Sequence, residues 1–242
     1  MPDVLSKQDG PVLEIILNRP DRGNGADDAM AIELTRLIKE APNETKCIVL
    51  RGAGADFCTG RVAAGPPPTG PGNAFAVRGF FEPVFNCYGA IRNSPIPVIA
   101  VVHGRALGFG CAIAAVADIT LASDAATFQV PEMAHNILPT MVMSSFVDRI
   151  PRKAFTYLVY STAVISAERA LSFGIVSDIV PSAKLDDAVV QITSAILKAP
   201  PPAVRGVKEY VRHAFSMHPD SAVDFARNIH ALINSSAEMR RT

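Results

Sequence analysis

Glu132 is the acid of this chain whose surroundings best suit proton transfer. It lies in the segment FQVPEMAHNILP (128–139), and it is the only Asp or Glu between Asp124 and Asp148. Apolar neighbours disfavour the charged form of a carboxyl group and raise its pKa, which suits a general acid or base. The alternative interpretation is an acid near a helix start, where the helix dipole favours negative charge.

Two turns rich in small residues could supply backbone N–H groups to a reacting oxygen. The first is ADFCTGR (55–61), and the second opens the segment GRALGFGCAIAAVAD (104–118). The first N–H groups of a helix have no partner within it, and glycine lets a ligand approach the backbone. If both turns converge on one oxygen, they form an oxyanion hole. The alternative for the second turn is close helix–strand packing, because its G-x-x-x-G-x-G spacing is not the dinucleotide fingerprint.

The elements that must position these residues alternate between strands and helices. Hydrophobic periodicity predicts strands at 12–17, 47–50, 97–102 and 118–122, and helices at 27–40, 74–92 and 111–117. The chain is then mainly helical, with helices at 166–174, 186–198, 202–215 and after Pro219, and an extended piece at 175–180. This order predicts an α/β core with crossover connections. The Pro/Gly-rich loop at 60–73 is a candidate substrate lid.

The overall composition argues against several function classes. The 242 residues carry 23 Lys plus Arg and 23 Asp plus Glu, so no basic footprint for nucleic acid is expected. No stretch is long enough for a membrane span, and the N-terminus lacks the apolar core of a signal peptide. The four cysteines form no C-x-x-C pair, so we predict free thiols, no metal site and a cytoplasmic protein.

Five segments, in order along nearly the whole chain, resemble motifs of the crotonase family, also called the enoyl-CoA hydratase/isomerase superfamily. LNRPDRGNGADDAM (17–30) resembles the family's L-N-R-P-x-x-x-N-A-L opening, and FCTGR (57–61) resembles its F-x-x-G-x-D turn. HGRALGFGCAIAAVADITLAS (103–123) resembles its glycine-turn segment, and ATFQVPEMAHNILP (126–139) resembles A-x-F-x-x-P-E-x-x-x-G-x-x-P. SAERALSFGIVSDIVP (166–181) resembles A-x-x-A-x-x-x-G-x-V-x-x-V.

The resemblance implies an α/β fold made of a spiral of ββα turns, over residues 1–190. A C-terminal helical region, 191–242, would belong to the same functional unit and drive assembly into a homotrimer or a hexamer (a dimer of trimers). The implied substrate is an acyl-CoA thioester, with coenzyme A bound as part of the substrate and no permanent cofactor. Neither nucleic acid nor a membrane is an expected partner.

The resemblance also implies which residues form the site. The thioester oxygen would lie between the N–H groups of Thr59 and Phe109, which would stabilise an enolate, while Glu132 moves the proton. The residues expected to contact the substrate or its CoA are Arg22, Gly25, Cys58, Gly60, Arg61, Val62, Gly108, Gly110, Pro131, His135, Asn136, Thr140 and Lys208.

Three departures from the family pattern shape the interpretation. Hydratases of the family usually carry a second glutamate where this chain has Ala112, so a single carboxylate favours isomerase-type proton transfer. Phe109 replaces the middle glycine of the turn, which would narrow or reshape the pocket. Arg61 and Val62 replace Ala and Asp; Arg61 could meet a CoA phosphate or an acidic acyl group, or be a solvated loop residue.

Two alternatives to an isomerase remain open. The protein could hydrate, hydrolyse or cleave an unusual acyl-CoA, with water activated by Glu132 alone or with His135. It could instead be a degenerate member that binds acyl-CoA or a partner without catalysis.

Lys208 is expected on a C-terminal helix, from which it could reach a phosphate of the substrate. The alternative interpretation is that Lys208 is an ordinary surface lysine.

Overall fold

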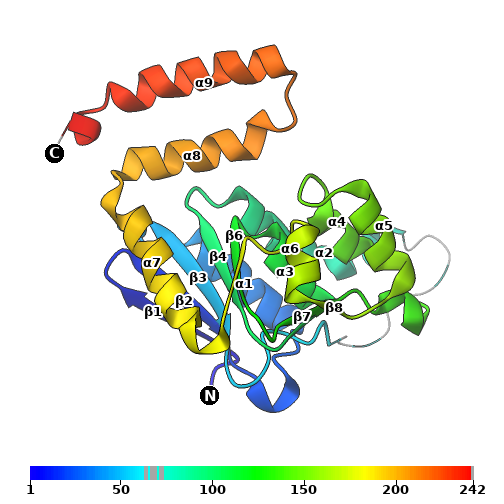
Figure 1. Cartoon of the computed structure of the whole chain (residues 1–242). Coiled ribbons are helices and arrows are strands. Elements are labelled where there is room, and N and C mark those ends of the chain that lie inside the picture. The colour runs from blue at the N-terminus through cyan, green and yellow to red at the C-terminus, as the bar shows by residue number, and fades with distance from the viewer. Residues whose placement is uncertain (63–64, 66–69, 71–73, 241–242) are drawn as a thin grey trace.

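A six-stranded sheet forms the centre of the protein, as seen in a computed structural model that describes residues 1–62, 65, 70 and 74–240 (Figure 1). Its strand order is β1-β2-β3-β4-β6-β9, with β1 and β2 antiparallel and all later pairs parallel. These strands are β1 (Val4–Asp9), β2 (Val12–Leu17), β3 (Cys47–Gly52), β4 (Val98–Val102), β6 (Ile119–Ser123) and β9 (Asp178–Val180). A second sheet joins β5 (Arg105–Leu107), β7 (Thr127–Gln129) and β8 (Ile165–Ser166).

Helices cover both faces of the large sheet. One face packs in a common core with α1 (Asp28–Lys39), α2 (Ala74–Asn93), α3 (Phe109–Val116) and α4 (Thr140–Phe146). On the other face, alternate residues of β3 and β4 pack against α7 (Leu185–Lys198). Because β4 is buried on both faces, every residue of its sequence VIAVV is apolar.

The apolar alternation of VLEIIL sets which face of β2 is covered by helices. Its buried residues are Leu13, Ile15 and Leu17, and all three belong to the core on the α1 side. They share that face because successive side chains of a strand point to opposite sides of the sheet. The order of apolar residues along the strand therefore fixes its orientation against α1.

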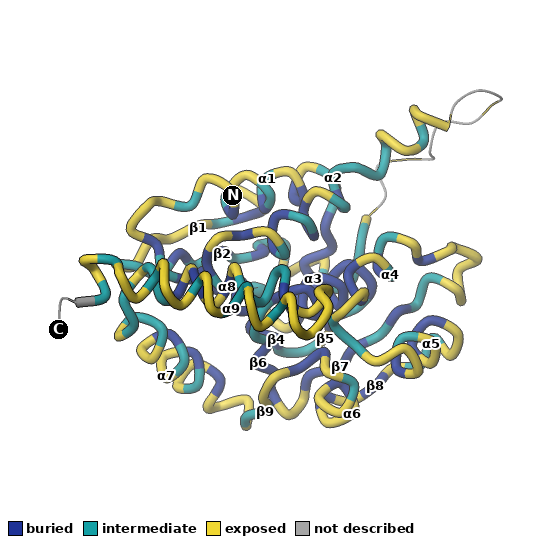
Figure 2. The backbone as a smooth tube through the Cα atoms, turned by 90° about the horizontal axis from the view of Figure 1, so that it is seen from above, coloured by how far each residue is buried: buried dark blue, intermediate teal, exposed yellow. Residues whose placement is uncertain are grey.

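The remaining helices lie toward one end of the sheet and above it. They are α5 (Arg152–Ser161), α6 (Ala167–Ser172), α8 (Pro201–Ala214) and α9 (Pro219–Asn234). The helices α8 and α9 form a hairpin above the body, and α9 buries none of its residues (Figures 1 and 2). Short 3-10 helices occur at Pro20–Arg22, Glu132–His135, Ser182–Lys184 and Ala237–Arg240.

Most of the predicted elements are present, and the predicted α/β core followed by helices is confirmed. The predicted caps are also found: Asp27 accepts a hydrogen bond from the Met30 N–H, and Ser166 accepts one from the Arg169 N–H. Five of the strands and α-helices have no counterpart among the predicted ones, namely β1, β5, β7, β8 and α4, which are short or, in β1, polar on the exposed side. The helix α5 lies mostly in the region beyond Ala154, which is predicted to be mainly helical. The predicted division at residue 190 falls within α7 and stays a prediction.

Two further expectations concern the loop and the membrane. Residues 63–64, 66–69 and 71–73 of the predicted lid loop lie outside the described residues, so the lid stays a prediction. Among the helices that the structure describes, none is both long and apolar enough to cross a lipid bilayer.

Candidate functional site

The glycine turn at residues 108–110 forms the start of α3, two residues earlier than predicted. Gly108 is the N-cap and has φ +48°, a conformation that favours glycine. Its N–H donates to the Gln129 carbonyl at 2.9 Å, and the first bond inside the helix runs from the Ala112 N–H to the Gly108 carbonyl at 2.9 Å. The Phe109 N–H finds no acceptor among the described residues, so it is free to bind a ligand oxygen.

The hydrogen bonds of Thr59 contradict its predicted role as a donor. Its N–H donates to the Gly23 carbonyl at 2.9 Å, and its hydroxyl donates to the same oxygen at 3.0 Å. Both groups therefore hold the turn to the segment that precedes α1. A donor that is already bonded within the fold cannot stabilise a substrate oxyanion.

The geometry offers the N–H of Arg61 in its place. The Gly60 carbonyl accepts a hydrogen bond from the Ala26 N–H at 2.9 Å, and the Val62 N–H donates to the Ala26 carbonyl at 2.8 Å. Because a trans peptide directs its C=O and N–H to opposite sides, the Arg61 N–H points away from Ala26. It finds no acceptor among the residues that the structure describes.

Gly60 makes this orientation possible. In a regular strand the N–H groups of Thr59 and Arg61 would point to the same side, since the direction alternates with a period of two. Gly60 has φ +119°, which reverses the peptide that follows it. The result is that Arg61, two residues after Thr59, directs its N–H to the opposite side.

The two turns meet closely. A Cβ placed on Gly108 would lie 3.8 Å from the Gly60 Cα, and one placed on Gly110 would lie 2.2 Å from the Cys58 carbonyl oxygen. Only glycine at position 110 lets α3 approach the 58–62 segment so closely. The free N–H groups of Phe109 and Arg61 thus belong to adjoining turns, as an oxyanion hole requires.

Glu132 lies directly over the glycine turn. It is the first residue of the 3-10 helix that follows Pro131, and its Oε1 would be 2.7 Å from a Cβ on Gly108. Its Oε2 is buried and has no hydrogen-bond partner among the described residues. Burial raises the pKa of the Glu132 carboxyl, and the nearby charge of His135 opposes this rise. The carboxyl group is therefore available to exchange a proton with a ligand.

Some residues predicted to contact the substrate surround these turns. Gly25 is buried, and a Cβ there would lie 2.9 Å from Val62 Cγ2 and 4.0 Å from the Gly60 carbonyl oxygen. Arg22 is exposed and lies next to Gly23, which accepts the Thr59 hydrogen bonds. Pro131 is half-buried, whereas His135, Asn136 and Thr140 are exposed after Glu132. Their contacts with substrate stay predictions.

Lys208 does not fit its predicted role at a phosphate. Its side chain is only 3% exposed, and Nζ donates to Asp118 Oδ1 at 2.7 Å and Oδ2 at 2.6 Å. It also donates to the Ile91 carbonyl at 3.3 Å. The lysine is a buried structural ion-pair partner, and its surface alternative is equally wrong.

Two more predicted contacts need correction. The guanidinium group of Arg61 pairs with Asp28 at 2.7 Å, so its side chain is neither a solvated arginine nor free for a phosphate. The Cys58 thiol is fully buried, and burial raises its pKa to about 12. Cys58 contributes to the turn through its main chain, which bonds to Arg105 and Leu107 of β5.

The Phe109 ring turns inward to the core. It is 2% exposed and packs against Tyr88 of α2, with ring centroids 5.5 Å apart. Burial raises the pKa of Tyr88, with smaller contributions from Cys87, Cys58 and Glu132. Sequence reasoning missed Tyr88, because its helical spacing from Val84 and Ile91 is typical of an ordinary core residue.

These features can perform one kind of chemistry. Two N–H groups on adjoining turns, neither of them bonded to a described residue, can stabilise an oxygen that gains negative charge. A partly buried carboxyl group with a raised pKa beside them can take a proton from a nearby carbon and return it.

Several known proteins resemble this chain in sequence and in fold. The family model described as Enoyl-CoA hydratase/isomerase matches residues 7–242. The chain is 27% identical to the 1,2-epoxyphenylacetyl-CoA isomerase of Escherichia coli K12, covering 98% of this chain and 92% of that protein. An enoyl-CoA hydratase structure from Mycobacterium smegmatis has a TM-score of 0.90 at 25% identity, covering 98% and 93% of the two chains. A structure from Thermobifida fusca YX in complex with CoA has a TM-score of 0.87 at 26% identity, covering 95% and 92%.

Proposed function

Because the chain belongs to the enoyl-CoA hydratase/isomerase family, we propose that it acts on an acyl-CoA thioester by stabilising an enolate. The observation that carries this proposal is the Glu132 carboxyl group beside the N–H groups of Arg61 and Phe109. Neither the buried Glu132 Oε2 nor either N–H group has a hydrogen-bond partner among the described residues. The thioester oxygen would accept hydrogen bonds from both N–H groups. Ionised Glu132 would then remove a proton from the α-carbon.

Isomerase-type proton transfer fits these residues best. When the α-proton leaves a β,γ-unsaturated acyl group, the electron pair moves into the thioester and forms a dienolate. Glu132 then returns the proton to the γ-carbon, and the double bond moves to the α,β position. Ala112 is fully buried and offers no second acid for activating water. The E. coli relative is named an isomerase and the M. smegmatis neighbour a hydratase, so their names do not choose between these reactions.

The CoA portion of the substrate is part of the proposal. It is supported by the CoA complex of the T. fusca protein and by the exposed Arg22 beside the site. A homotrimer or hexamer is likewise proposed, because α9 buries no residue within the chain. A cytoplasmic location stays a prediction from the sequence.

The first test follows α-proton exchange on a saturated acyl-CoA in D₂O. The wild type should exchange the proton, and Glu132→Gln should lose roughly 10²–10⁴-fold in rate because the general base is gone. Glu44→Gln, the same change at an exposed glutamate outside the site, is the matched control and should retain exchange. Exchange by Glu132→Gln at the wild-type rate would contradict the proposal. Tight acyl-CoA binding without exchange by the wild type would favour the binding-only alternative.

Hydration of an unusual acyl-CoA is the second candidate. It is favoured by the position of His135, whose charge acts on the Glu132 carboxyl and which could help to hold a water. Mass spectrometry of products from a panel of enoyl-CoA thioesters separates the two reactions. An unchanged mass marks isomerisation, and a gain of one water marks hydration.

A further inference from the structure

The Arg61 side chain is held by two neighbouring helices. Its Nη2 lies 2.7 Å from Asp28 Oδ1 and its Nε lies 3.3 Å from the same atom. The two side chains are only 14% and 23% exposed. On α2, the guanidinium carbon lies 5.7 Å from the ring centroids of both Phe80 and Phe81.

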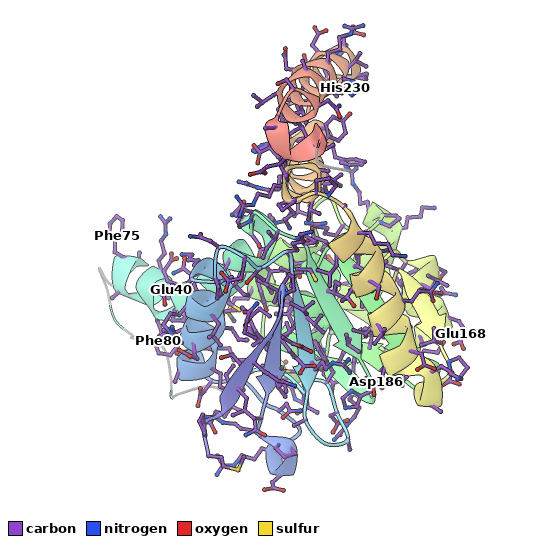
Figure 3. All side chains as sticks on the ribbon, turned by 90° about the vertical axis from the view of Figure 1, so that its left-hand side faces the viewer. Glu40, Phe75, Phe80, Glu168, Asp186 and His230 are labelled. Atoms are coloured by element: carbon purple, nitrogen blue, oxygen red, sulfur yellow. The ribbon has the colours of Figure 1, made fainter. Side chains whose placement is uncertain are left out.

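These contacts connect three elements that surround the site. Asp28 is the first residue of α1, which the buried Met30 and Leu34 fix to the core. Phe80 lies in the half of α2 that extends from the body, on the same side as Glu40 at the end of α1 (Figure 3). Arg61 lies between them, in the 58–62 segment. A guanidinium group suits this place, because its planar fork binds a carboxylate and stacks on aromatic rings.

The Gly60–Arg61 peptide needs such support. Gly60 has φ +119°, and glycine by itself does not favour one backbone conformation strongly. On one side the peptide is fixed by the Ala26 hydrogen bond to the Gly60 carbonyl. The Val62 N–H, one residue further on, donates to the Ala26 carbonyl at 2.8 Å, whereas the Arg61 N–H has no partner among the described residues. The contacts of the Arg61 side chain with Asp28 and the two rings add a further restraint to these two hydrogen bonds.

We infer that Asp28 is a positioning residue for the oxyanion hole, which it serves by holding the Arg61 side chain and thereby the direction of the Arg61 N–H. The inference rests on the proposed function and deepens it. This inference gives a role to the departure from the family pattern at position 61. The main chain of Arg61 supplies the N–H donor, and its side chain keeps that donor in place.

The test compares Asp28→Asn with Glu33→Gln. Both remove one charge from α1, but Glu33 pairs with Arg36 on the exposed side of the helix. Asp28→Asn should slow α-proton exchange by roughly 10-fold to 100-fold, since a small misplacement of a catalytic group can cost that much. The KM for the acyl-CoA should change less than kcat, because the donor acts mainly on the transition state. Glu33→Gln should match the wild type.

Two further measurements distinguish positioning from general damage. The carbonyl stretch of a bound ¹³C-labelled acetyl-CoA should move toward that of the free thioester in Asp28→Asn and not in Glu33→Gln. In an Arg61→Met background, Asp28→Asn should have little further effect, because residues that act through one contact are not additive. Asp28→Glu, which keeps the carboxylate, should recover most of the exchange rate.

The outcomes separate this inference from the proposed function. A folded Asp28→Asn with wild-type exchange and a wild-type carbonyl stretch would overturn the positioning role, as would full additivity with Arg61→Met. If the wild type does not exchange the α-proton, that result would instead contradict the proposed enolate chemistry. The carbonyl stretch still tests the positioning role in that case, because it needs only a bound thioester.

Discussion

At the scale of single residues, burial decides what Glu132 can do. Its carboxyl group lies over Gly108 with one oxygen unbonded, and burial raises its pKa. A carboxylate that accepted several hydrogen bonds here would hold its charge too well to take a proton efficiently. Because the Glu132 Oε2 has no hydrogen-bond partner among the described residues, the carboxylate can take up a proton more readily.

The raised pKa of Glu132 predicts two opposite effects of pH. Exchange requires the ionised base, so its rate should rise with pH through the raised pKa and reach a plateau above it. Stability should change the other way: the folded state binds this proton more tightly, so the free energy of unfolding falls as pH rises from the ordinary glutamate value to the raised one. Glu132→Gln lacks this contribution, so its stability relative to the wild type should increase across that window.

The measurement is urea unfolding of both proteins at several pH values, together with the pH profile of exchange. A stability difference that stays constant with pH would show that Glu132 titrates as an ordinary exposed carboxyl group. The activity profile would then have its midpoint at the ordinary glutamate value.

Gly60→Ala tests the peptide that presents the Arg61 N–H. Nothing obstructs the new methyl group, because the nearest atom is the Leu107 carbonyl oxygen at 3.6 Å, but φ +119° strains any side chain. We expect roughly 10²–10³-fold slower exchange, as for loss of one oxyanion donor, and a stability cost of about 1–3 kcal/mol. Gly10→Ala is the control, since Gly10 has φ +52° in open space in the β1–β2 turn. Gly10→Ala should be less stable than the wild type but should exchange the α-proton at the wild-type rate. Equal exchange rates for Gly60→Ala and Gly10→Ala would contradict the assignment of Arg61 as a donor.

At the scale of elements, the site depends on how closely α3 packs on the 58–62 segment. The Cβ of an alanine at position 110 would lie 2.2 Å from the Cys58 carbonyl oxygen, which belongs to the main chain and cannot rotate away. One free N–H belongs to each element. Their separation is therefore set by this packing.

Gly110→Ala should push the two elements apart and lose exchange by at least roughly 10²-fold, because a displacement of about 1 Å is enough for such a loss. Gly89→Ala on α2 is the matched control. Its Cβ would have only Asn93 Nδ2 near it, at 4.0 Å, so helix propensity should make it neutral or more stable by up to about 1 kcal/mol. Near wild-type exchange by Gly110→Ala, measured on folded protein, would show that the close approach is not needed.

At the scale of the whole molecule, a buried ion pair joins α8 to the sheet. Lys208 contacts Asp118, which also accepts a hydrogen bond from the Val98 N–H at the start of β4. Burial lowers the pKa of Lys208, while Asp118 favours its charged form. The pair therefore holds the C-terminal helices on the body, and this structural role replaces the predicted contact with substrate.

Lys208→Met should destabilise the protein by roughly 3–5 kcal/mol, because it leaves the Asp118 carboxylate buried without its partner. Chemical denaturation measures this change, and isothermal titration with CoA measures binding by the folded fraction. CoA affinity should match the wild type. Weaker CoA binding at unchanged stability would restore the phosphate role for Lys208.

Local patterns in the sequence were enough to predict the family, the main elements and Glu132 as the candidate acid. The alternation of VLEIIL, the caps Asp27 and Ser166, and the isolation of Glu132 among apolar residues are local patterns, and local patterns can be read along a chain. The glycine turn also predicted that Phe109 has an N–H group available for a ligand, because the first N–H groups of a helix have no partner within it.

The other groups of the candidate site are identified by contacts between distant parts of the chain. The candidate donor is Arg61 and not Thr59, because the direction of a peptide N–H depends on hydrogen bonds to Gly23 and Ala26, more than 30 positions away. The charge of Arg61 is met by Asp28, 33 positions away, and that of Lys208 by Asp118, 90 positions away. Partners so distant in sequence are chosen by packing of the whole chain, and no local pattern in the sequence reports them.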